Sequence, residues 1–235
     1  MAERPIFIPQ SSGDLLVRTA LVEFKWFPGL SKSQSQKSIN SLHDSAREKF
    51  HLEKILEISS KSLDEYGVKL SAFNLMIKTV KYEREFSLEC AFQSSKVFEK
   101  GGPYVDLLKA RPIDAKRDER IRNSGRLVSF KFFGETWDII PRTAFYDWLY
   151  INALNKKEEL ANYVIQQDAF SDIAFNPEKS INCQGYSAAL YSSLRSRKII
   201  TPGIPIGKKL FLETISSASE SSTIKDVTEH GELDV

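Results

Sequence analysis

The sequence predicts an α+β fold that is predominantly helical, with small antiparallel strands in a single globular unit. Two observations lead to this prediction. The chain has 235 residues, of which 41% are hydrophobic, which is enough for one large core. Short segments rich in β-branched and aromatic residues lie among longer segments in which apolar residues repeat at helical spacing.

The N-terminal segment is predicted to be extended and then helical. Residues 3–28 contain RPIFIP and LLVRTALVEFKWF and are stopped by a Pro-Gly pair. A helix follows over residues 31–50, because its apolar residues repeat at spacings of three and four while the other side is polar. We expect a short helix and connections over residues 52–70.

Short strands and helices are predicted through the rest of the chain. Two strands joined by a turn precede a buried helix that begins near Leu88 and ends before Gly101. Two short helices, a hairpin turning at Gly134 and Glu135, two more helices, a loop and a last core helix follow. Apart from the buried helix, these elements cover, in order, residues 70–80, 82–88, 104–110, 112–123, 127–140, 142–154, 156–167, 169–183 and 184–198.

The buried helix carries one polar stripe. Glu89, Gln93 and Lys96 are spaced by four and three positions, so at 100° per residue they share one face, with apolar residues around the rest. Glu89 and Lys96 lie roughly 10 Å apart along such a helix, which is too far for an ordinary surface ion pair. Other groups must therefore satisfy them, or a ligand lies between them.

Composition argues against several classes of function. Lys and Arg total 33 against 31 for Asp and Glu, so we expect no general attraction to nucleic acid or anionic membranes. No apolar run approaches the roughly 20 residues of a membrane span, and the first ten residues lack a signal-peptide pattern. We expect a cytoplasmic protein without a membrane partner.

Metal and serine-nucleophile chemistry are also disfavoured. Cys90 and Cys183 lie far apart, and the three His residues are scattered, so no ligand spacing for a metal is present. The sequence has no G-x-S-x-G elbow. We therefore expect neither a metal nor a cofactor.

Residues 216–235 are net acidic and poor in large apolar groups, which predicts a disordered tail, with an interaction arm as the alternative.

Several motifs together resemble the NADAR family of N-glycosidases. Family members show a Ser-Asn-Phe-like strand start, a Glu-His-x-Phe-Gln-x-x-Lys-Phe helix, an Ala-x-x-x-Gly-Arg segment followed by Trp-Glu, and late Asp-x-x-Trp-Gly and Gly-x-Asn-x-Leu-Gly motifs. The corresponding segments here, in the same order, are LSAFN at 70–74, ECAFQSSKVF at 89–98, AKRDERIRNSGR at 115–126, TWD at 136–138, FSDIAFN at 170–176 and SINCQG at 180–185. The resemblance covers roughly residues 70–196. It is closer to the antitoxins found beside DNA ADP-ribosyltransferase toxins than to the riboflavin-pathway branch.

The resemblance implies a domain organisation and an activity. It implies a NADAR-like catalytic domain over residues 70–215, with residues 1–69 as an extension packed on it and 216–235 as the tail. The implied function is an N-glycosidase that removes ADP-ribose from ADP-ribosylated guanine in DNA, reversing the modification made by a toxin and releasing ADP-ribose. Cys90 replaces the motif His, Phe175 and Asn176 replace Trp-Gly, and Ser180 replaces a Gly. These departures concern substrate selectivity more than reaction class.

Three residues are the candidates for catalysis. Lys96 matches the family's lysine, and a buried amine has a lowered pKa that makes its neutral, nucleophilic form accessible for a Schiff base with ring-opened ribose. Glu89 is the expected general acid/base. Asp172 is expected to orient the lysine or a ribose hydroxyl. The structural alternatives are a buried polar network for Glu89 and Lys96 and a turn cap for Asp172.

The candidate substrate-binding residues each have a structural alternative. Gln93 is expected to bind ribose hydroxyls, and Phe175 frames Asp172 with an aromatic wall. A base would stack on or bond to aromatic and amide groups, and phosphates would meet an arginine and the start of the last helix. The alternatives are core packing, a solvated basic face and N-capping. The residues given these base and phosphate roles are Phe73, Asn74, Trp137, Arg126 and Asn182.

Two other functions remain open from the sequence alone. The same pocket would also suit a module that binds ADP-ribose or nucleic acid without turnover. A structural or interaction protein is the third possibility, with the polar helix 31–50 and the tail meeting a partner. If the protein is an enzyme that acts on modified DNA, six local basic residues would steer a phosphate-rich strand: Lys109, Arg111, Lys116, Arg117, Arg120 and Arg122.

Overall fold

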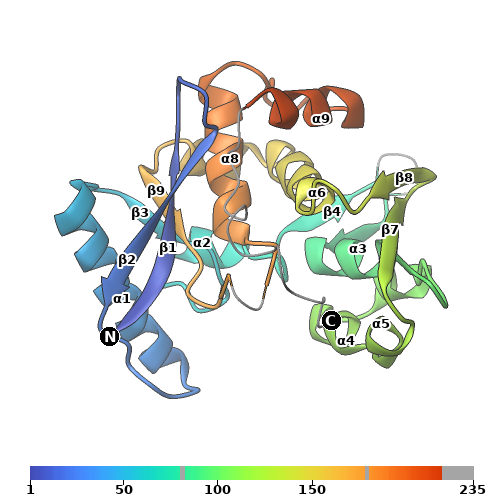
Figure 1. The fold of residues 1–235 in the computed structure, drawn as a ribbon, viewed down its shortest axis with the longest axis horizontal. Helices are drawn as coiled ribbons and strands as arrows, with labels where there is room; N and C mark the ends of the chain where they lie inside the picture. The colour runs from blue at the N-terminus through green and yellow to red at the C-terminus, as the bar shows by residue number, and fades with distance from the viewer. Residues whose placement is uncertain (80–82, 178–179, 219–235) are drawn as a thin grey trace.

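The computed structural model describes residues 1–79, 83–177 and 180–218. In this part of the chain, a four-stranded and a three-stranded sheet flank a layer of helices, and a two-stranded sheet is also present (Figure 1). Figure 1 shows the sheet that contains β1 and β2 on the left, α8 in the centre, and β7 and β8 on the right. The strand orders are β2-β1-β9-β3, β4-β5 and β6-β7-β8. The predicted α+β fold, predominantly helical with small antiparallel strands, is confirmed.

The four-stranded sheet joins distant parts of the chain. β1 (Ala2–Pro9) and β2 (Val17–Phe24) form an antiparallel hairpin, which confirms the predicted extended start. β9 (Ala169–Ser171) pairs with β1, and β3 (Ile55–Glu57) pairs with β9 in parallel. Both β3 and β9 were predicted as connections, because three-residue strands carry too little pattern to stand out from a loop.

Helix α1 (Lys32–Phe50) covers one side of this sheet and confirms the helix predicted over 31–50. Ser31 caps it by accepting a hydrogen bond from the Gln34 N–H. Its apolar side packs in a cluster with buried residues of β1, β2 and β9. The division of the chain at residue 69 stays a prediction, but β1 and β3 on one side of that boundary both pair with β9 on the other.

The centre of the chain departs from the prediction in two places. After α2 (Glu65–Lys69), residues 70–75 form a turn instead of a strand, because the Asn74 and Leu75 N–H groups both donate to the Ser71 carbonyl. Only β4 (Met76–Lys78) and β5 (Glu85–Ser87) pair as the predicted hairpin. The polar-stripe helix, α3, is shorter than predicted: it runs over Leu88–Ser95, and Lys96 begins β6 (Lys96–Phe98).

The region beyond β6 holds short helices and the third sheet. η1 (Val105–Lys109) is a 3₁₀ turn, and the helix predicted over 112–123 is two helices, α4 (Pro112–Arg117) and α5 (Glu119–Asn123), because Asp118 leaves helical geometry to cap α5. β7 (Leu127–Phe132) and β8 (Glu135–Asp138) confirm the hairpin. Its turn is Phe133–Gly134, one residue earlier than predicted, and both residues have positive φ.

The core helices are α6 (Ala144–Asn155), α7 (Glu158–Val164) and α8 (Gln184–Ser196), as predicted. α9 (Lys208–Ser217) was not predicted; buried Phe211 anchors it, and it includes the first two residues assigned to the tail. Ala218 follows this helix as its C-cap, and residues 219–235 of the predicted tail lie outside the described residues. Among the described helices, none is both long and apolar enough to cross a membrane.

Candidate functional site

A cavity of about 420 Å³ lies between α3, α4 and the segment that follows β9. It is large enough for a sugar and part of a nucleotide, since ligand pockets typically measure about 300–1,000 Å³. Seven of the candidate residues line it, although they come from four separate segments of the chain: Phe73, Glu89, Gln93, Lys96, Asp172, Phe175 and Asn182.

Helix α3 supplies a buried carboxyl and a buried amide to this cavity. Ser87 caps the helix, which places Glu89 in its first turn, where the helix dipole favours a negative charge. Glu89 and Gln93 are each 6% exposed, and Gln93 Nε2 donates to Glu89 Oε1 at 2.9 Å. Gln93 Oε1 is buried and has no hydrogen-bond partner among the described residues. The amide therefore fixes Glu89 and offers a free acceptor.

Lys96 enters the cavity from the junction of α3 and β6. Its Nζ lies 5.1 Å from the centre of the Phe92 ring, and it forms no ion pair with a carboxylate of the described chain. Burial lowers the pKa of Lys96 to about 8; the Glu89 charge opposes this shift and the Lys116 charge adds to it. A substantial fraction of this amine is thus neutral near physiological pH.

Asp172 faces the cavity from the other side. It is 5% exposed, and its carboxylate accepts hydrogen bonds from the Ala174 N–H at 3.1 Å and from Gln184 Nε2 at 3.0 Å. Burial raises the pKa of Asp172, and these hydrogen bonds oppose the shift. The Ala72 N–H donates in turn to Gln184 Oε1 at 2.5 Å. Asp172 is therefore held at both oxygens, as well as capping the turn that follows it.

Aromatic rings and a second free acceptor complete the wall. Phe175 packs edge-on against Phe7 at 6.2 Å, and Lys116 Nζ lies 5.7 Å from the centre of the Phe73 ring. Asn182 Oδ1 is buried without a hydrogen-bond partner in the described structure. Cys183, not Asn182, occupies the N-cap position of α8, so N-capping does not account for Asn182.

Three candidate residues do not line this cavity. Asn74 is exposed in the turn and donates to the Val68 carbonyl and to Ser71 Oγ. Arg126 is exposed and pairs with Glu99 at 2.7 Å. Trp137 is 1% exposed and packs in the aromatic core against Phe145 and Trp148. Local packing or pairing accounts for Asn74, Arg126 and the Trp137 ring, while the buried Trp137 Nε1–H has no hydrogen-bond partner among the described residues.

Comparison with protein families identifies this architecture. Residues 2–225 match the family described as DarT1-associated NADAR antitoxin. The chain belongs to this family of NADAR antitoxins. The match begins at β1, whereas the motifs in the sequence supported the resemblance only from residue 70. A comparison with curated proteins gives no match.

The candidate site of this NADAR antitoxin contains residues that the sequence did not single out. Tyr146 and Gln184 line the cavity. Tyr146 lies in an apolar run of α6, where a pocket-facing aromatic residue has the same pattern as a core residue. Gln184 is part of the SINCQG segment already used for the resemblance, so a signal for it was present.

Of the six basic residues expected to steer a nucleic acid, two reach the antitoxin's cavity. Lys116 and Arg122 line it. Arg111 is instead paired with Asp114, and Arg120 bridges Asp106 and Asp118. Lys116 and Arg122 are therefore the two residues of this set that are placed to meet a ligand in the cavity.

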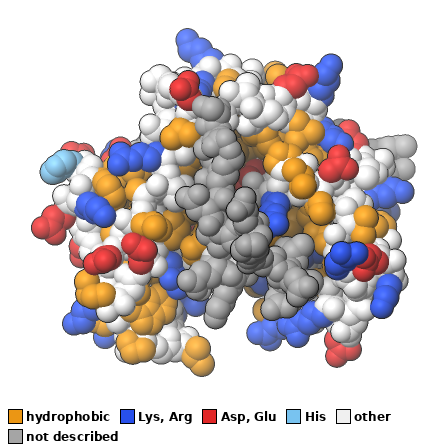
Figure 2. Space-filling view, viewed as in Figure 1, with side chains coloured by type: hydrophobic (Ala, Val, Ile, Leu, Met, Phe, Trp, Pro, Cys, Tyr) orange, Lys and Arg blue, Asp and Glu red, His pale blue; other side chains and the backbone are white. Residues whose placement is uncertain are grey.

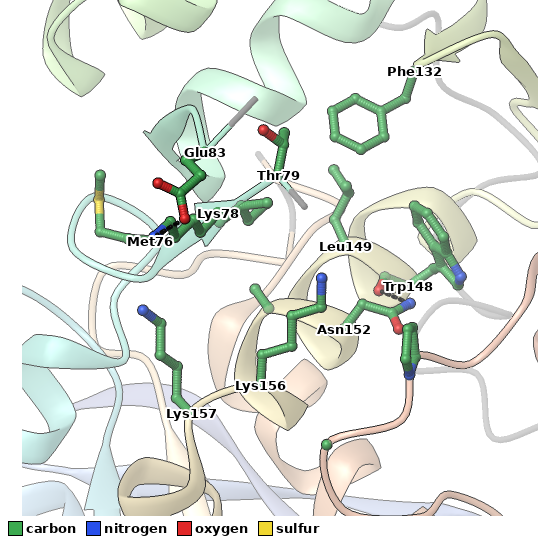
Figure 3. Close-up of a pocket in the computed structure, with 14 residues that line it drawn as sticks. Met76, Lys78, Thr79, Glu83, Phe132, Trp148, Leu149, Asn152, Lys156 and Lys157 are labelled. Atoms are coloured by element: carbon green, nitrogen blue, oxygen red, sulfur yellow. Dashed lines mark hydrogen bonds and ion pairs between the residues drawn. The ribbon is translucent and has the colours of Figure 1, made fainter. Parts of the chain in front are cut away.

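A second cavity of about 670 Å³ lies beside α6 (Figure 3). Lys78 and Glu83 form an ion pair there at 3.1 Å, and Lys156 and Lys157 extend into the same space from the end of α6. Glu83 is 77% exposed and already paired, so this cavity lacks the buried carboxyl beside an unpaired amine that distinguishes the first one.

No group of three or more His, Cys, Asp or Glu side chains in the described residues is arranged to hold a metal ion. Both cysteines are buried, and burial raises the pKa of each thiol. The polar groups that line the first cavity include an amine, two carboxyl groups and several amides.

Proposed function

We propose that this antitoxin is an N-glycosidase that removes ADP-ribose from ADP-ribosylated guanine in DNA, with Lys96 as the nucleophile. One observation carries the proposal. Lys96, whose pKa is lowered to about 8, forms no ion pair with a described carboxylate and lies in the same cavity as the buried carboxyls of Glu89 and Asp172. Such an arrangement suits covalent catalysis by an amine, because its neutral form is the nucleophile.

The reaction can be written with these groups. The neutral Lys96 Nζ forms a bond to C1′ of the ribose as the C1′–N bond to guanine breaks. The electron pair of the broken bond stays on the guanine nitrogen, which takes up the proton that the newly alkylated Lys96 nitrogen gives up. Ring opening then protonates the ring oxygen and leaves a Schiff base between C1′ and Nζ. Water hydrolyses it, releasing ADP-ribose and restoring the amine.

Glu89 and Asp172 divide the remaining tasks. Glu89 is the general acid/base that delivers a proton to the ring oxygen and later accepts one from water. Asp172, held at both oxygens, orients a ribose hydroxyl or the lysine. The buried acceptors Gln93 Oε1 and Asn182 Oδ1 lack donors among the described residues, and sugar hydroxyl groups supply donors of the required kind.

The rim of the cavity favours a flat, anionic ligand. The Phe73 ring offers a stacking surface for a base, and such stacking typically contributes about 1–3 kcal/mol. Lys116 and Arg122 provide positive charge for phosphate groups. The family is described as associated with DarT1. Together with the resemblance to antitoxins found beside DNA ADP-ribosyltransferase toxins, this association supports guanine-linked ADP-ribose in DNA as the substrate.

The test is release of ADP-ribose from DNA that carries ADP-ribosylated guanine. The wild type should release it, Lys96→Ala and Lys96→Arg should not, and borohydride should trap a covalent adduct with the wild type alone. Lys96→Arg keeps the positive charge without an accessible neutral amine, so it separates nucleophilic from electrostatic roles. Tight binding of ADP-ribose by the wild type with no release from modified DNA would establish the binding-module alternative and overturn the proposal.

A further inference from the structure

A buried glutamate lies directly behind Asp172, outside the cavity. Glu57, the last residue of β3, is 2% exposed. Ser171 Oγ donates to its Oε2 at 2.5 Å, and the Ile173 N–H donates to Oε1 at 2.9 Å and to Oε2 at 3.2 Å. These donors belong to the residues immediately before and after Asp172. The Glu57 carboxyl group thus accepts hydrogen bonds from the chain on both sides of Asp172, which lines the cavity.

The hydrogen bonds continue away from the cavity to α1. His43, which is 6% exposed, shares a hydrogen bond of 2.8 Å between its Nε2 and Ser171 Oγ. When Glu57 is ionised and Ser171 donates its single proton to it, His43 Nε2 has to be the donor in this bond. A neutral His43 with its proton on Nε2 meets this requirement, and burial lowers the pKa of His43 to about 3. Two hydrogen bonds in series therefore connect His43, Ser171 and Glu57.

The two carboxyl groups influence each other. Burial and, after it, the charge of nearby Asp172 raise the pKa of Glu57 to about 7, against the opposing effect of hydrogen bonds from Ser171, Ile173 and Ser59. Two neighbouring buried carboxyl groups would be costly if nothing held them. Here Glu57 takes its donors from the backbone and hydroxyl flanking Asp172, so the Asp172 carboxyl is left to point toward Gln184 and the cavity.

We propose that Glu57 is a positioning residue, which fixes the direction in which Asp172 presents its carboxyl group to the substrate by holding Ser171 and Ile173. This inference rests on the proposed function, since it gives Asp172 its task in that reaction. It assigns a role to the N-terminal part of the chain, where none of the motifs that suggested the family resemblance lies. A misplacement of about 1 Å in such a group can cost roughly 100-fold in rate.

The experiment compares Glu57→Gln with a matched control, Asp147→Asn. Asp147 is also a buried carboxyl, 3% exposed, that accepts a serine hydroxyl at 2.5 Å, from Ser187, and burial raises its pKa to about 7. It does not line the cavity. The measurements are kcat and KM for ADP-ribose release, the melting temperature, and amide hydrogen exchange at Ala174, whose N–H is bonded to Asp172.

We expect Glu57→Gln to lower kcat roughly 10- to 100-fold with little change in KM, and to speed exchange at Ala174. Asp147→Asn should lower the melting temperature to a similar extent and change neither kcat nor that exchange. Equal kcat values in the two variants would overturn the inference. If the wild type itself released no ADP-ribose, the proposed function would fail, and exchange at Ala174 would decide on the positioning role: faster exchange in Glu57→Gln alone supports it, and unchanged exchange overturns it.

Discussion

Lys96 shows how one residue acquires its chemical character from its surroundings. The sequence predicted that Lys96 and Glu89 share a sheltered face, and both do line one cavity. It did not predict that the chain leaves the helix at Lys96, because that change comes from pairing with Phe130, which is distant in sequence. Trp137 and Arg126 show the converse: their residue types suit ligand binding, but tertiary packing and an ion pair account for them.

The rate of ADP-ribose release should follow the ionisation of Lys96. Its pKa is lowered to about 8, and only the neutral amine attacks, so the rate should rise about tenfold per pH unit below this value and level off above it. A single-turnover pH profile between about pH 6 and 9.5 measures this. A rate that is flat or falls over this interval would contradict the role of a neutral amine.

Lys96→Met should stabilise the protein while abolishing activity. The pKa of Lys96 is about 8 in the folded protein, against the ordinary lysine value of 10.5 that applies to the unfolded chain. Between these two values the unfolded chain binds more protons than the folded protein, so the stability of the wild type rises with pH there. The gain in melting temperature should therefore be largest below pH 8 and shrink as the pH approaches 10.5. Each kcal/mol relieved corresponds to roughly 2–4 °C. A variant less stable than the wild type at pH 7 would argue against a costly buried amine.

At the scale of elements, the junction of α3 and β6 depends on the turn behind it. Gly102 has φ of +90°, and a Cβ at this position would lie 2.3 Å from the Lys96 carbonyl oxygen. The sequence indicated a break at Gly101–Pro103 from the residue types alone. It gave no indication that this turn passes so close to the lysine backbone, because that contact depends on how β6 folds back.

Gly102→Ala should lower both stability and activity, and Gly134→Ala provides the matched control. Both glycines have φ of +90°, but nothing lies within 4 Å of a Cβ at Gly134. The control should lose about 1 kcal/mol from backbone strain. Gly102→Ala should lose more and also reduce the rate of ADP-ribose release, because the alanine displaces the Lys96 backbone. Thermal melts and the release assay measure the two effects; equal losses in both variants would show that the close contact is unimportant.

At the scale of the whole molecule, the site depends on strands from opposite ends of the sequence. β9, which leads into Asp172, is flanked by β1 and β3. Local patterns predicted most helices, the extended start of the chain and the β7–β8 hairpin, since these depend on neighbours in sequence. They did not predict β3, β9 or the part played by Glu57, since these depend on contacts between residues more than 110 positions apart.

A chain of residues 70–235 should therefore fail to fold on its own. It would lack both strands that flank β9, as well as Glu57. We expect no cooperative thermal transition and rapid proteolysis, whereas the full chain should melt cooperatively. A stable, active fragment would instead show that residues 1–69 form a separate unit.

The charges of the molecule should act locally on its substrate. The net charge is only +2, and on the face shown in Figure 2 basic and acidic side chains are interspersed. Lys116→Ala and Arg122→Ala should each raise KM for modified DNA and reduce the slope of log KM against log salt concentration by up to about 0.7–0.9. Arg111→Ala removes a paired, exposed arginine and should leave the slope unchanged. An equal effect of all three would indicate diffuse attraction instead.

The wall of the cavity also has a consequence for synthesis of the protein in the cell. The Phe7 ring packs against Phe175 at 6.2 Å and Tyr186 at 5.9 Å, so residues made first meet residues made late. During synthesis the first hairpin emerges early, yet the candidate site has no complete wall until the segment through α8 has emerged. A copy that stops before α8 should therefore give no protection as an antitoxin.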